Sequence, residues 1–593
     1  MLKRFFLFSL SLLFVFVPTN QAQNYDFSNY SLNMNSMIST LVDLRFNNAG
    51  SGGFFEAIGN SGDTLYIAPL IDVAYFAFGI TEAEVEIYGA LETLTGEPPI
   101  RAWATYLEWA SENDIALPPD YDLFKSNLLS TLIDPDFAPF FENVQATAQI
   151  NMVEVVWGGV SVDGIPSLVN ARQLSPEEAL AQGEALTQFC ADGDCSYPQR
   201  DEFVFGVEID GDARAYPLRQ MNWHEMFNDV IGHTALYDVP NGTQVCNFRA
   251  PTVFQVIARD GDDWVQINGV SAGCIEQGWV SSQDLEWVNA DWETVRDDLP
   301  DISQNETALN VENGIDGRVS GRPVMLAYCT LCGAGILYDV TIPDLTYTDT
   351  EGNLIEAGET VLEFGSTGML MRSNKLMYDR NTNTVWNAFT GIPAFGDLAT
   401  SGIELPLLPV VVTTWSDWLE DHPDTSVLSL ETGFARNYTN GAAYSDYFND
   451  SNFIMFPSFQ QNTDTVQNKE MIFGLIISDT PRAYPLTILV DEPVVNDTLD
   501  DLEIVIISEA SPERDFFEPG GAAVRAYERA GLTFSLDDNG VLVDDMGNTW
   551  QLTEDTLIAE DGRRLERIAG HLAFWFGWYG FYPETDLYAV IVE

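Results

Sequence analysis

The chain has 593 residues, of which 26 are Lys or Arg and 90 are Asp or Glu, so its formal net charge is -64. Such a charge repels phosphate backbones and anionic headgroups, which argues against nucleic acid partners and against binding at a membrane surface. A hydrophobic share of 46% excludes a disordered acidic tail, and the length predicts several domains with cores of their own.

The first 22 residues have the order of a secretory signal peptide. Lys3 and Arg4 precede an apolar run over residues 5–17, and Pro18 and a short polar stretch follow. The run is too short to cross a bilayer as a stable helix. We therefore expect residues 1–22 to be removed, leaving a secreted or periplasmic protein without a membrane span.

Residues 23–155 are expected to form a helical N-terminal region. Apolar residues recur there at spacings of three and four between Gly-Asp, Pro-Pro and Asp-Pro turns, which is the pattern of amphipathic helices. Nothing in this region indicates catalysis, so the pattern favours a scaffold or a contact surface.

Six cysteines fall into three pairs whose members lie close together in the sequence. Because an exported protein meets oxidising conditions, we expect disulfides between Cys190 and Cys195 and between Cys246 and Cys274. The third pair differs from these two because glycines and an apolar strand surround it.

The remainder of the chain is expected to be a duplicated β-rich α+β body. Residues 205–218 recur as residues 473–486, with Phe-Gly near the start and Arg-Ala-Tyr-Pro-Leu at the end of both segments. The first half would comprise residues 156–232 and 301–430, and a second, degenerate half would comprise residues 431–593. The predicted fold class is therefore a multidomain α+β protein.

An insertion at residues 233–300 separates the two parts of the first half. It alternates apolar and polar residues and ends with Gly278-Trp279-Val280 followed by a polar turn and Leu285. This ending resembles that of a bacterial SH3-like module, which implies a small β-barrel. Such a module would bind a cell-wall or other extracellular partner or would act as a spacer, and both roles stay open.

The two halves differ at the positions that could carry chemistry. His224 of the first half becomes Glu492 in the second. The strand at residues 324–327, which leads into Cys329 and Cys332, aligns with a strand that leads into Ser and Glu. The second half thus lacks both the histidine and the cysteine pair, which suggests that they act together.

A soft transition metal is the favoured ligand of these residues. His224, Cys329 and Cys332 could bind zinc or copper with one coordination position open, and a thioether from Met377 would favour copper. The pair also supports two other interpretations, a redox-active disulfide and an inert structural disulfide. A c-type haem is disfavoured because Gly333 occupies the place of the histidine in that motif.

Two carboxylates are the candidate catalytic residues. Glu225 follows His224 and could bind the metal, orient a ligand or act as a general base, or it could lie on a solvated helix face. Asp379 precedes Arg380, and this pair is either catalytic or a structural ion pair. Calcium is a weaker expectation at the acidic loops 260–263 and 537–545, which lack EF-hand spacing and are interpreted as solvated turns.

The motifs from residue 160 to the end together resemble the bacterial and archaeal family called domain of unknown function 3179. The matching motifs occur in the family's order and include Asp163-Gly-Ile-Pro166, residues 206–218 and 224–229, Tyr328-Cys-Thr-Leu-Cys-Gly333, Phe364-Gly365, residues 377–380 and Trp386. The chain departs from the family by its insertion before the cysteine pair. The family's name implies no reaction.

We therefore predict a secreted protein that binds copper or zinc at His224, Cys329 and Cys332, with redox or hydrolytic chemistry at the open position. Two alternatives remain. One is a non-enzymatic extracellular binding or scaffold protein with structural disulfides, and the other is a thiol–disulfide redox protein.

Overall fold

The structure is a computed structural model in which the chain divides into two compact units. One comprises residues 1–101 and 117–135, and the other comprises residues 102–116 and 136–593. The structure describes residues 34–47, 50–98, 102–142, 144–168, 172–190, 193–232, 235–247, 253–268, 277–287, 296, 299–304, 315–319, 321–349, 352–458, 466–510 and 522–588. The expected signal peptide lies outside these residues, as does Cys274.

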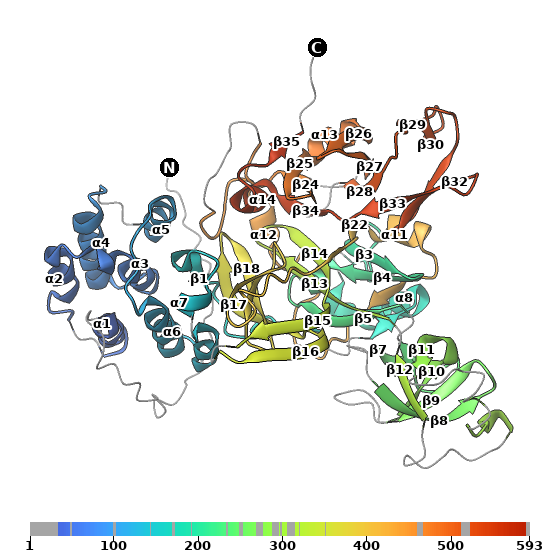
Figure 1. Ribbon diagram of the computed structural model, residues 1–593, viewed down its shortest axis with the longest axis horizontal. Helices are drawn as coiled ribbons and strands as arrows, with labels where there is room; N and C mark the ends of the chain where they lie inside the picture. Colours follow the sequence, from blue (N-terminus) through green and yellow to red (C-terminus); the bar gives the residue numbers. More distant parts are fainter. Residues whose placement is uncertain are drawn as a thin grey trace. The chain divides into compact units, whose positions relative to one another are not determined.

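The smaller unit is built from α-helices around α3, which is buried along nearly all of its length. Its helices are α1 (Met34–Phe46), α2 (Phe54–Ser61), α3 (Ile67–Phe76), α4 (Thr81–Thr95) and α6 (Tyr121–Leu132) (Figure 1). Within the core, Lys125 Nζ lies 3.1 Å from Asp72 Oδ1, and Tyr121 donates a hydrogen bond to the same carboxylate. This buried pair joins α3 to α6.

The larger unit contains two pairs of antiparallel-rich sheets that repeat one strand order. In the first half, the order β2-β23-β4-β3-β22 stands beside β21-β14-β13-β5. The bounds are β2 (Gln173–Leu174), β3 (Phe203–Ile209), β4 (Asp212–Pro217), β5 (Met226–Ile231), β13 (Arg322–Cys329), β14 (Ala334–Asp339), β21 (Leu407–Leu408), β22 (Val411–Thr414) and β23 (Ser426–Leu428).

The second half has the orders β34-β24-β25-β35 and β26-β27-β28-β33-β32-β31. Its strands are β24 (Met471–Ile477), β25 (Thr480–Pro485), β26 (Val494–Leu499), β27 (Leu502–Ala510), β28 (Ala522–Glu528), β31 (Trp550–Leu552), β32 (Thr556–Ala559), β33 (Arg564–Ile568), β34 (His571–Phe574) and β35 (Asp586–Leu587). In the first-named sheet of each half, the strand that comes last in the sequence pairs in parallel with its neighbour: β23 pairs with β4, and β35 pairs with β25.

A glycine and a tryptophan make the same contact in each half. A Cβ on Gly206 of β3 would lie 2.4 Å from the ring of Trp418, and one on Gly474 of β24 would lie 2.1 Å from the ring of Trp578. The two tryptophans lie on α11 (Trp415–Asp421) and α14 (Trp575–Phe581). Only glycine leaves room for the indole, so the repeated Phe-Gly motif fixes a helix on each sheet.

The repeated Arg-Ala-Tyr-Pro-Leu segment forms the same hydrogen-bond network in the two halves. Arg214 and Tyr216 of β4 both hydrogen-bond Asp229 of β5. Arg482 and Tyr484 of β25 likewise bond Asp497 of β26. Each network joins the two sheets of its half. Short helices follow the segments, α9 (Leu218–Met221) and α13 (Leu486–Asp491).

A third sheet of the larger unit contains the hairpin that matters for the site. Its order is β1-β17-β18-β19-β20, with β1 (Val155–Trp157), β17 (Phe364–Met371), β18 (Asn374–Asp379), β19 (Val385–Asn387) and β20 (Ile392–Phe395). Its counterpart in the second half is the shorter hairpin of β29 (Phe534–Leu536) and β30 (Leu542–Asp544). The β15 (Thr341–Thr348) and β16 (Leu354–Val361) strands form a separate hairpin.

The inserted segment forms a sheet of order β11-β12-β8-β9-β10-β6-β7 with its own small core, which includes Leu236, Val256, Ile267 and Val280. The strands are β6 (Ala235–Tyr237), β7 (Gln244–Asn247), β8 (Val253–Asp260), β9 (Trp264–Asn268), β10 (Gln277–Ser281), β11 (Leu285–Trp287) and β12 (Ile315–Val319). The sheet therefore extends beyond the expected boundary at residue 300, because β12 pairs with β8 and β11.

The largest hydrophobic core is shared by both halves. It combines residues of β3, β13 and β14 with residues of β24, β27 and β34. Neither half encloses these residues alone, so the two halves fold around one interior. Among the described residues, no helix is long and apolar enough to cross a membrane.

Candidate functional site

The cysteine pair lies at the tight turn between β13 and β14. Cys329 is the last residue of β13, and the backbone N–H of Cys332 donates to its carbonyl at 3.2 Å. Gly333 has φ 61°, a left-handed conformation that closes the turn. Both thiols are free and buried, with Cys329 5% exposed and Cys332 0% exposed. By contrast, the predicted disulfide between Cys190 and Cys195 is confirmed, whereas the expected Cys246–Cys274 pairing lies outside the described residues.

Both thiols face the turn of the β17–β18 hairpin. The carbonyl of Ser373 accepts from Cys329 Sγ at 3.6 Å and from Cys332 Sγ at 3.2 Å. Arg372 and Ser373 have φ of 50° and 63°, as a two-residue hairpin turn requires. The turn thus sets one carbonyl oxygen against both sulfurs, and the next two residues on β18 are Asn374 and Lys375.

Lys375 connects the cysteines to a buried carboxylate. Its ammonium forms an ion pair with Glu225, and the exposed fraction of the Glu225 side chain is 0%. Burial raises the pKa of Glu225, and the charge of Lys375 opposes that shift. The second carboxylate oxygen, Oε2, has no hydrogen-bond partner among the described residues. A charged lysine is therefore held inside the core beside the thiols.

The two thiols differ in acidity. Burial alone would raise the pKa of Cys329, but a hydrogen bond from Cys332 and the positive charge of Lys375 lower it to about 7. Burial and the neighbouring Cys329 raise the pKa of Cys332 well above its usual range. Cys329 is therefore the more acidic of the two thiols, and its hydrogen bond to the carbonyl of Ser373 exists only in the protonated form.

Aromatic and amide groups enclose the pair. Tyr447 donates to the carbonyl of Leu331, between the cysteines, at 2.7 Å. The phenol of Tyr447 has a pKa that burial and the two cysteines raise. Asn374 is 1% exposed, and no nitrogen or oxygen in the described part of the chain hydrogen-bonds its side-chain amide. That amide is available to the sulfurs, since it acts on Cys332 to lower the pKa of that thiol.

His224 does not join this cluster. Its Nδ1 lies 3.2 Å from the carbonyl of Pro166, its Nε2 bonds the hydroxyl of Tyr438, and its ring packs on Phe434. Burial lowers its pKa to about 4, so the ring is neutral at pH 7. The backbone N–H of His224 donates to the carbonyl of Gln220 in the turn after α9, so this turn, and not a strand, sets the direction of the His224 ring, while Glu225 reaches Lys375. No group of three or more His, Cys, Asp or Glu that could hold a metal ion occurs among the described residues.

The other predicted site residues, Met377 and Asp379, lie on strand β18. Met377 is fully buried on β18, opposite Trp386 in the sheet register. Asp379 ends that strand and accepts hydrogen bonds from Trp386 Nε1 at 2.8 Å and from the backbone and hydroxyl of Thr382. Burial raises the pKa of Asp379 to about 6 despite these bonds. Its predicted partner Arg380 instead pairs with Asp163 at 2.8 Å.

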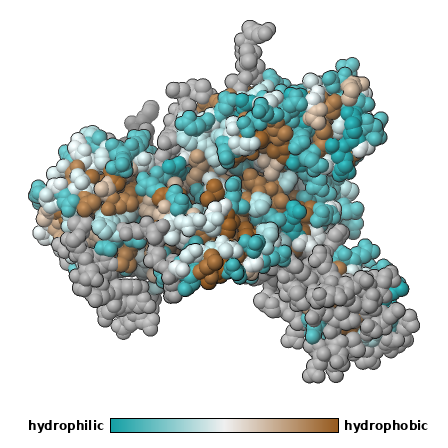
Figure 2. Space-filling view, in the orientation of Figure 1, coloured by the Kyte–Doolittle hydropathy of each residue, from teal (hydrophilic) through white to brown (hydrophobic). Residues whose placement is uncertain are grey.

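The acidic loops are closed turns in the described residues. Asp537 and Asp544 each accept backbone N–H groups of their own loops, from residues 539 and 541 and from residues 546 and 548. Figure 2 shows hydrophilic side chains mixed with hydrophobic ones over this region of β29, β30 and β32, where Leu536, Val541 and Met546 are exposed. The carboxylates are thus committed to the turns, as solvated turns require.

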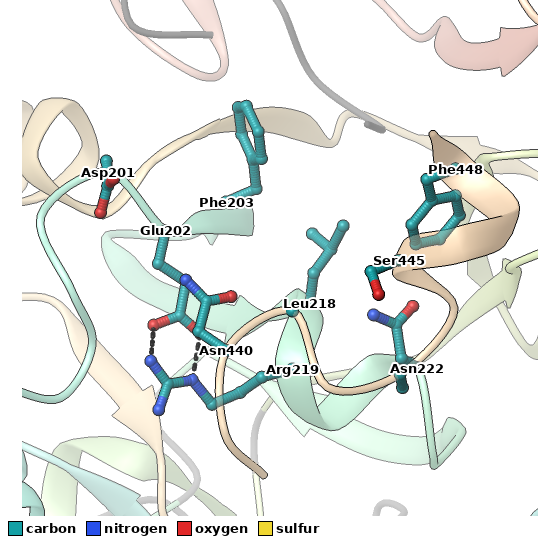
Figure 3. A pocket seen from close by; sticks show the side chains of 11 residues that line it. Asp201, Glu202, Phe203, Leu218, Arg219, Asn222, Asn440, Ser445 and Phe448 are labelled. Carbon is teal, nitrogen blue, oxygen red and sulfur yellow. Dashed lines mark hydrogen bonds and ion pairs between the residues drawn. The ribbon is translucent and has the colours of Figure 1, made fainter. Parts of the chain in front are cut away.

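Two cavities lie away from the cysteines. One, of about 40 Å³, is lined by the buried Glu202–Arg219 ion pair, Asn222, Asn440 and Ser445 (Figure 3). It has room for water and not for a substrate. A polar cleft of about 490 Å³ lies between the first-half sheet and the inserted module and includes Arg214 and Tyr237. Cys329 and Cys332 line neither cavity.

Lys375 is the residue of the site that sequence reasoning did not assign. The available signal was its rarity: the chain has only four lysines, at positions 3, 125, 375 and 469, and this one directly precedes the apolar residues Leu376 and Met377. A buried lysine needs a buried partner, which Glu225 supplies.

A comparison with family models finds one match. The model described as protein of unknown function (DUF3179) matches residues 162–237 and 306–585, which is more than half of the chain. The gap between the two matched ranges coincides with most of the inserted sheet. No curated protein and no solved structure matches the chain significantly.

Proposed function

The chain belongs to the family described as protein of unknown function (DUF3179), and because that description assigns no reaction, we propose a function from the site: Cys329 and Cys332 form a redox-active dithiol that exchanges with a disulfide substrate. The observation that carries this proposal is the pair of free, buried thiols that share the carbonyl of Ser373 beside the buried Lys375–Glu225 ion pair. The sequence favoured a metal site, but the orientation of His224 removes its third ligand.

The exchange balances in two steps. The thiolate of Cys329 attacks one sulfur of the substrate disulfide, whose S–S bond breaks, and the other sulfur leaves and takes up a proton. Cys332 then loses its proton and attacks Cys329 Sγ, so that the mixed disulfide breaks and the second substrate thiol leaves. Two electrons pass from the cysteines to the substrate, which leaves a Cys329–Cys332 disulfide and two thiols.

The surrounding residues assign one role to each cysteine. The positive charge of Lys375 favours the thiolate of Cys329, and Glu225 holds the lysine in the core through their ion pair. Cys332 is protonated and fully buried, which suits the second, resolving step. Cys-X-X-Cys redox proteins likewise have a cysteine with a lowered pKa.

The proposal is tested by equilibrating the protein with mixtures of reduced and oxidised glutathione at pH 7, followed by an acid quench, alkylation and mass spectrometry of the peptide with residues 329–332. We expect reversible conversion between dithiol and disulfide. Cys332→Ser should accumulate a mixed disulfide of glutathione with Cys329. A pair that stays disulfide-bonded until the protein unfolds, or that stays reduced at every ratio, would contradict the proposal.

The lysine provides a charge test with a matched control. In Lys375→Met, the midpoint for alkylation of Cys329 should rise by about one pH unit, because the stabilising charge is lost. Lys375→Arg retains the charge and should leave the midpoint near pH 7. Equal midpoints in both variants would show that Lys375 does not act on the thiolate.

Copper(I) binding is the second candidate, favoured by the convergence of both sulfurs on one point. Thiolates select Cu(I), and a two-sulfur site needs neither His224 nor Met377, whereas zinc requires further ligands. Elemental analysis of protein prepared without chelators tests this. About one equivalent of copper that Cys329→Ser loses and His224→Ala retains would support it; metal-free wild-type protein would refute it.

We also propose that the protein works outside the cytoplasm. The signal-like residues 1–22 and the Cys190–Cys195 disulfide support this location. Fractionation of cells that express the full chain should place it in the periplasm or the medium. A cytoplasmic location with intact residues 1–22 would contradict it.

A further inference from the structure

The turn with the two cysteines is held by the second half of the chain as well as by the first. The backbone N–H of Phe574, at the end of β34, donates to the carbonyl of Cys332 at 2.7 Å. A Cβ on Gly333 would lie 3.1 Å from the ring of Phe574, so the turn packs directly on this strand. The hydrogen bond from Tyr447 to Leu331 adds a third point of attachment.

A glycine of the second half lies against Cys332. A Cβ on Gly577 of α14 would lie 2.9 Å from Cys332 Cβ and 3.3 Å from Cys332 Sγ. Gly577 lies inside a regular helix and has no positive φ, so its backbone does not require glycine. Glycine is unfavourable inside a helix, and the space for Cys332 is therefore the reason that the structure offers for it.

The equivalent helix of the first half shows that glycine is not needed for the helix itself. Both helices begin with Trp, have a second Trp at the fourth position, and direct that indole N–H to a threonine hydroxyl, Trp418 to Thr425 and Trp578 to Thr585. The third position is Asp417 in α11 and Gly577 in α14. Gly580 likewise stands where α11 has Glu420, so α14 has two glycines, and Gly577 is the one that lies against Cys332.

We infer that Gly577 is a positioning residue of the dithiol: with Phe574, it lets the second half hold Cys332 buried against Cys329 so that Cys332 acts as the resolving thiol. This inference rests on the proposed dithiol function. It gives the second half, which lacks cysteines of its own at this position, a role in the chemistry of the first half.

The experiment measures the two steps of exchange separately in Gly577→Ala. The rate of attack by Cys329 on glutathione disulfide should stay within about twofold of wild type, because the added methyl group lies at Cys332. The closure of the mixed disulfide by Cys332, followed by quenched mass spectrometry, should slow at least about tenfold, since a misplaced nucleophile reacts much more slowly. Asp417→Ala, at the equivalent position of α11, is the matched control and should change neither rate.

A gentler variant keeps the inference testable if Gly577→Ala does not fold. Tyr447→Phe removes only the hydroxyl that bonds Leu331 and should slow closure about fivefold, the factor that one ordinary hydrogen bond represents. If Gly577→Ala folds with lower stability but with wild-type closure, or if Tyr447→Phe leaves closure unchanged, the positioning role is wrong. If wild-type Cys329 does not react at all, the proposed function fails instead.

Discussion

The two halves of the larger unit carry different groups at the same place on one scaffold, a buried thiol in the first half and a half-exposed carboxylate in the second. At the end of β13, Cys329 stands opposite Ala334 in the sheet register. At the equivalent place on β27, Glu509 stands opposite Ala523 and forms an ion pair with Arg525 at 2.6 Å. The same strands thus carry a buried thiol in one half and a salt bridge in the other, so the chemistry is separable from the fold.

The replacements in the second half involve the whole site. Glu225, immediately before β5, has Pro493 before β26 as its counterpart. Lys375 lies four residues before Asp379, where the second half has Gly540, four residues before Asp544. The scaffold contacts made by the arginine, tyrosine, glycine and tryptophan residues persist in both halves, which separates the residues that maintain the fold from those that form the site.

The largest expected effect on stability comes from removing the tryptophan that occupies the same position in each half. Trp418→Ala and Trp578→Ala should each lower the free energy of unfolding by about 3–5 kcal/mol, because each indole is fully buried on a glycine. Urea unfolding at pH 7 measures both. The milder Trp418→Phe and Trp578→Phe variants, which lose the N–H donor to threonine, are the controls. If only one of the two alanine variants lowered the free energy of unfolding, the two helices would not be structurally equivalent.

His571, which the first half lacks at the equivalent position, should make the free energy of unfolding depend on pH. His571 of β34 occupies the position of Val411 on β22, and burial lowers its pKa to about 3. Below the unfolded pKa of about 6.5, only the unfolded chain binds this proton, so stability falls as the pH decreases from there toward 3.

His571→Val should therefore lose less stability than wild type between pH 7.5 and 4.5, by about 3 kcal/mol in urea titrations at the two values. His224→Gln is the comparison variant, because the pKa of His224 is also lowered, to about 4. If wild type and His571→Val had the same pH dependence, the neutral, buried state of His571 would be wrong.

Each half contains an aspartate that accepts a hydrogen bond from a tryptophan, and the comparison of the two tests whether Asp379 is structural or catalytic. Asp379 accepts from Trp386 while Phe364 packs edge-on against that indole, and Asp544, Trp550 and Phe534 repeat the arrangement. In the folded protein burial raises the pKa of Asp379 to about 6, whereas hydrogen bonds from residues 546, 548 and 550 outweigh burial and lower the pKa of Asp544 to about 2.

The same substitution should thus act with different sign in the two turns. The charge of Asp544 stabilises the fold at pH 7 and that of Asp379 destabilises it, so Asp544→Asn should cost about 5 kcal/mol more than Asp379→Asn at this pH. Urea unfolding measures the difference. If Asp379 is structural, as its repeated partners suggest, Asp379→Asn leaves alkylation of Cys329 unchanged; a slower reaction would restore the predicted catalytic role.

The smallest effect concerns the repeated tyrosines. Tyr216→Phe and Tyr484→Phe each remove one hydrogen bond to an aspartate, at 2.7 and 2.8 Å, and should cost about 1–2 kcal/mol. Thermal unfolding at pH 7 detects such a change. The hydrogen bond of Tyr216 is buried and that of Tyr484 only partly buried, so Tyr216→Phe should show the larger of the two effects, and the reverse order would contradict this view of the networks.

Local patterns were sufficient to predict the scaffold. The Phe-Gly and Arg-Ala-Tyr-Pro-Leu segments are adjacent strands whose contacts are short in sequence, and the Cys190–Cys195 loop closes over five residues, so each could be recognised from its own segment. The family resemblance, based on motifs in order, is confirmed by the family model.

The site depends on contacts that the sequence does not display. Lys375 and Glu225 are 150 residues apart, and Ser373 meets the cysteines from a different sheet. His224 was grouped with the cysteines because all three are absent from the second half, but residues absent together need not touch. Which way a side chain points depends on the tertiary packing, and here Glu225 pairs with Lys375 while His224 bonds Pro166 and Tyr438.

The join between β5 and β13 explains how the chain can carry an extra module at this point. Ile231 and Arg322 are partners in the sheet, so the segment between them leaves and re-enters at adjacent places. The second half closes the equivalent join with a two-residue turn, Asp500-Asp501, both in the left-handed conformation. Excision of the module and its replacement by that short turn would leave the hairpin register unchanged, so such an appendage can be gained or lost between relatives without redesign of the protein that bears it.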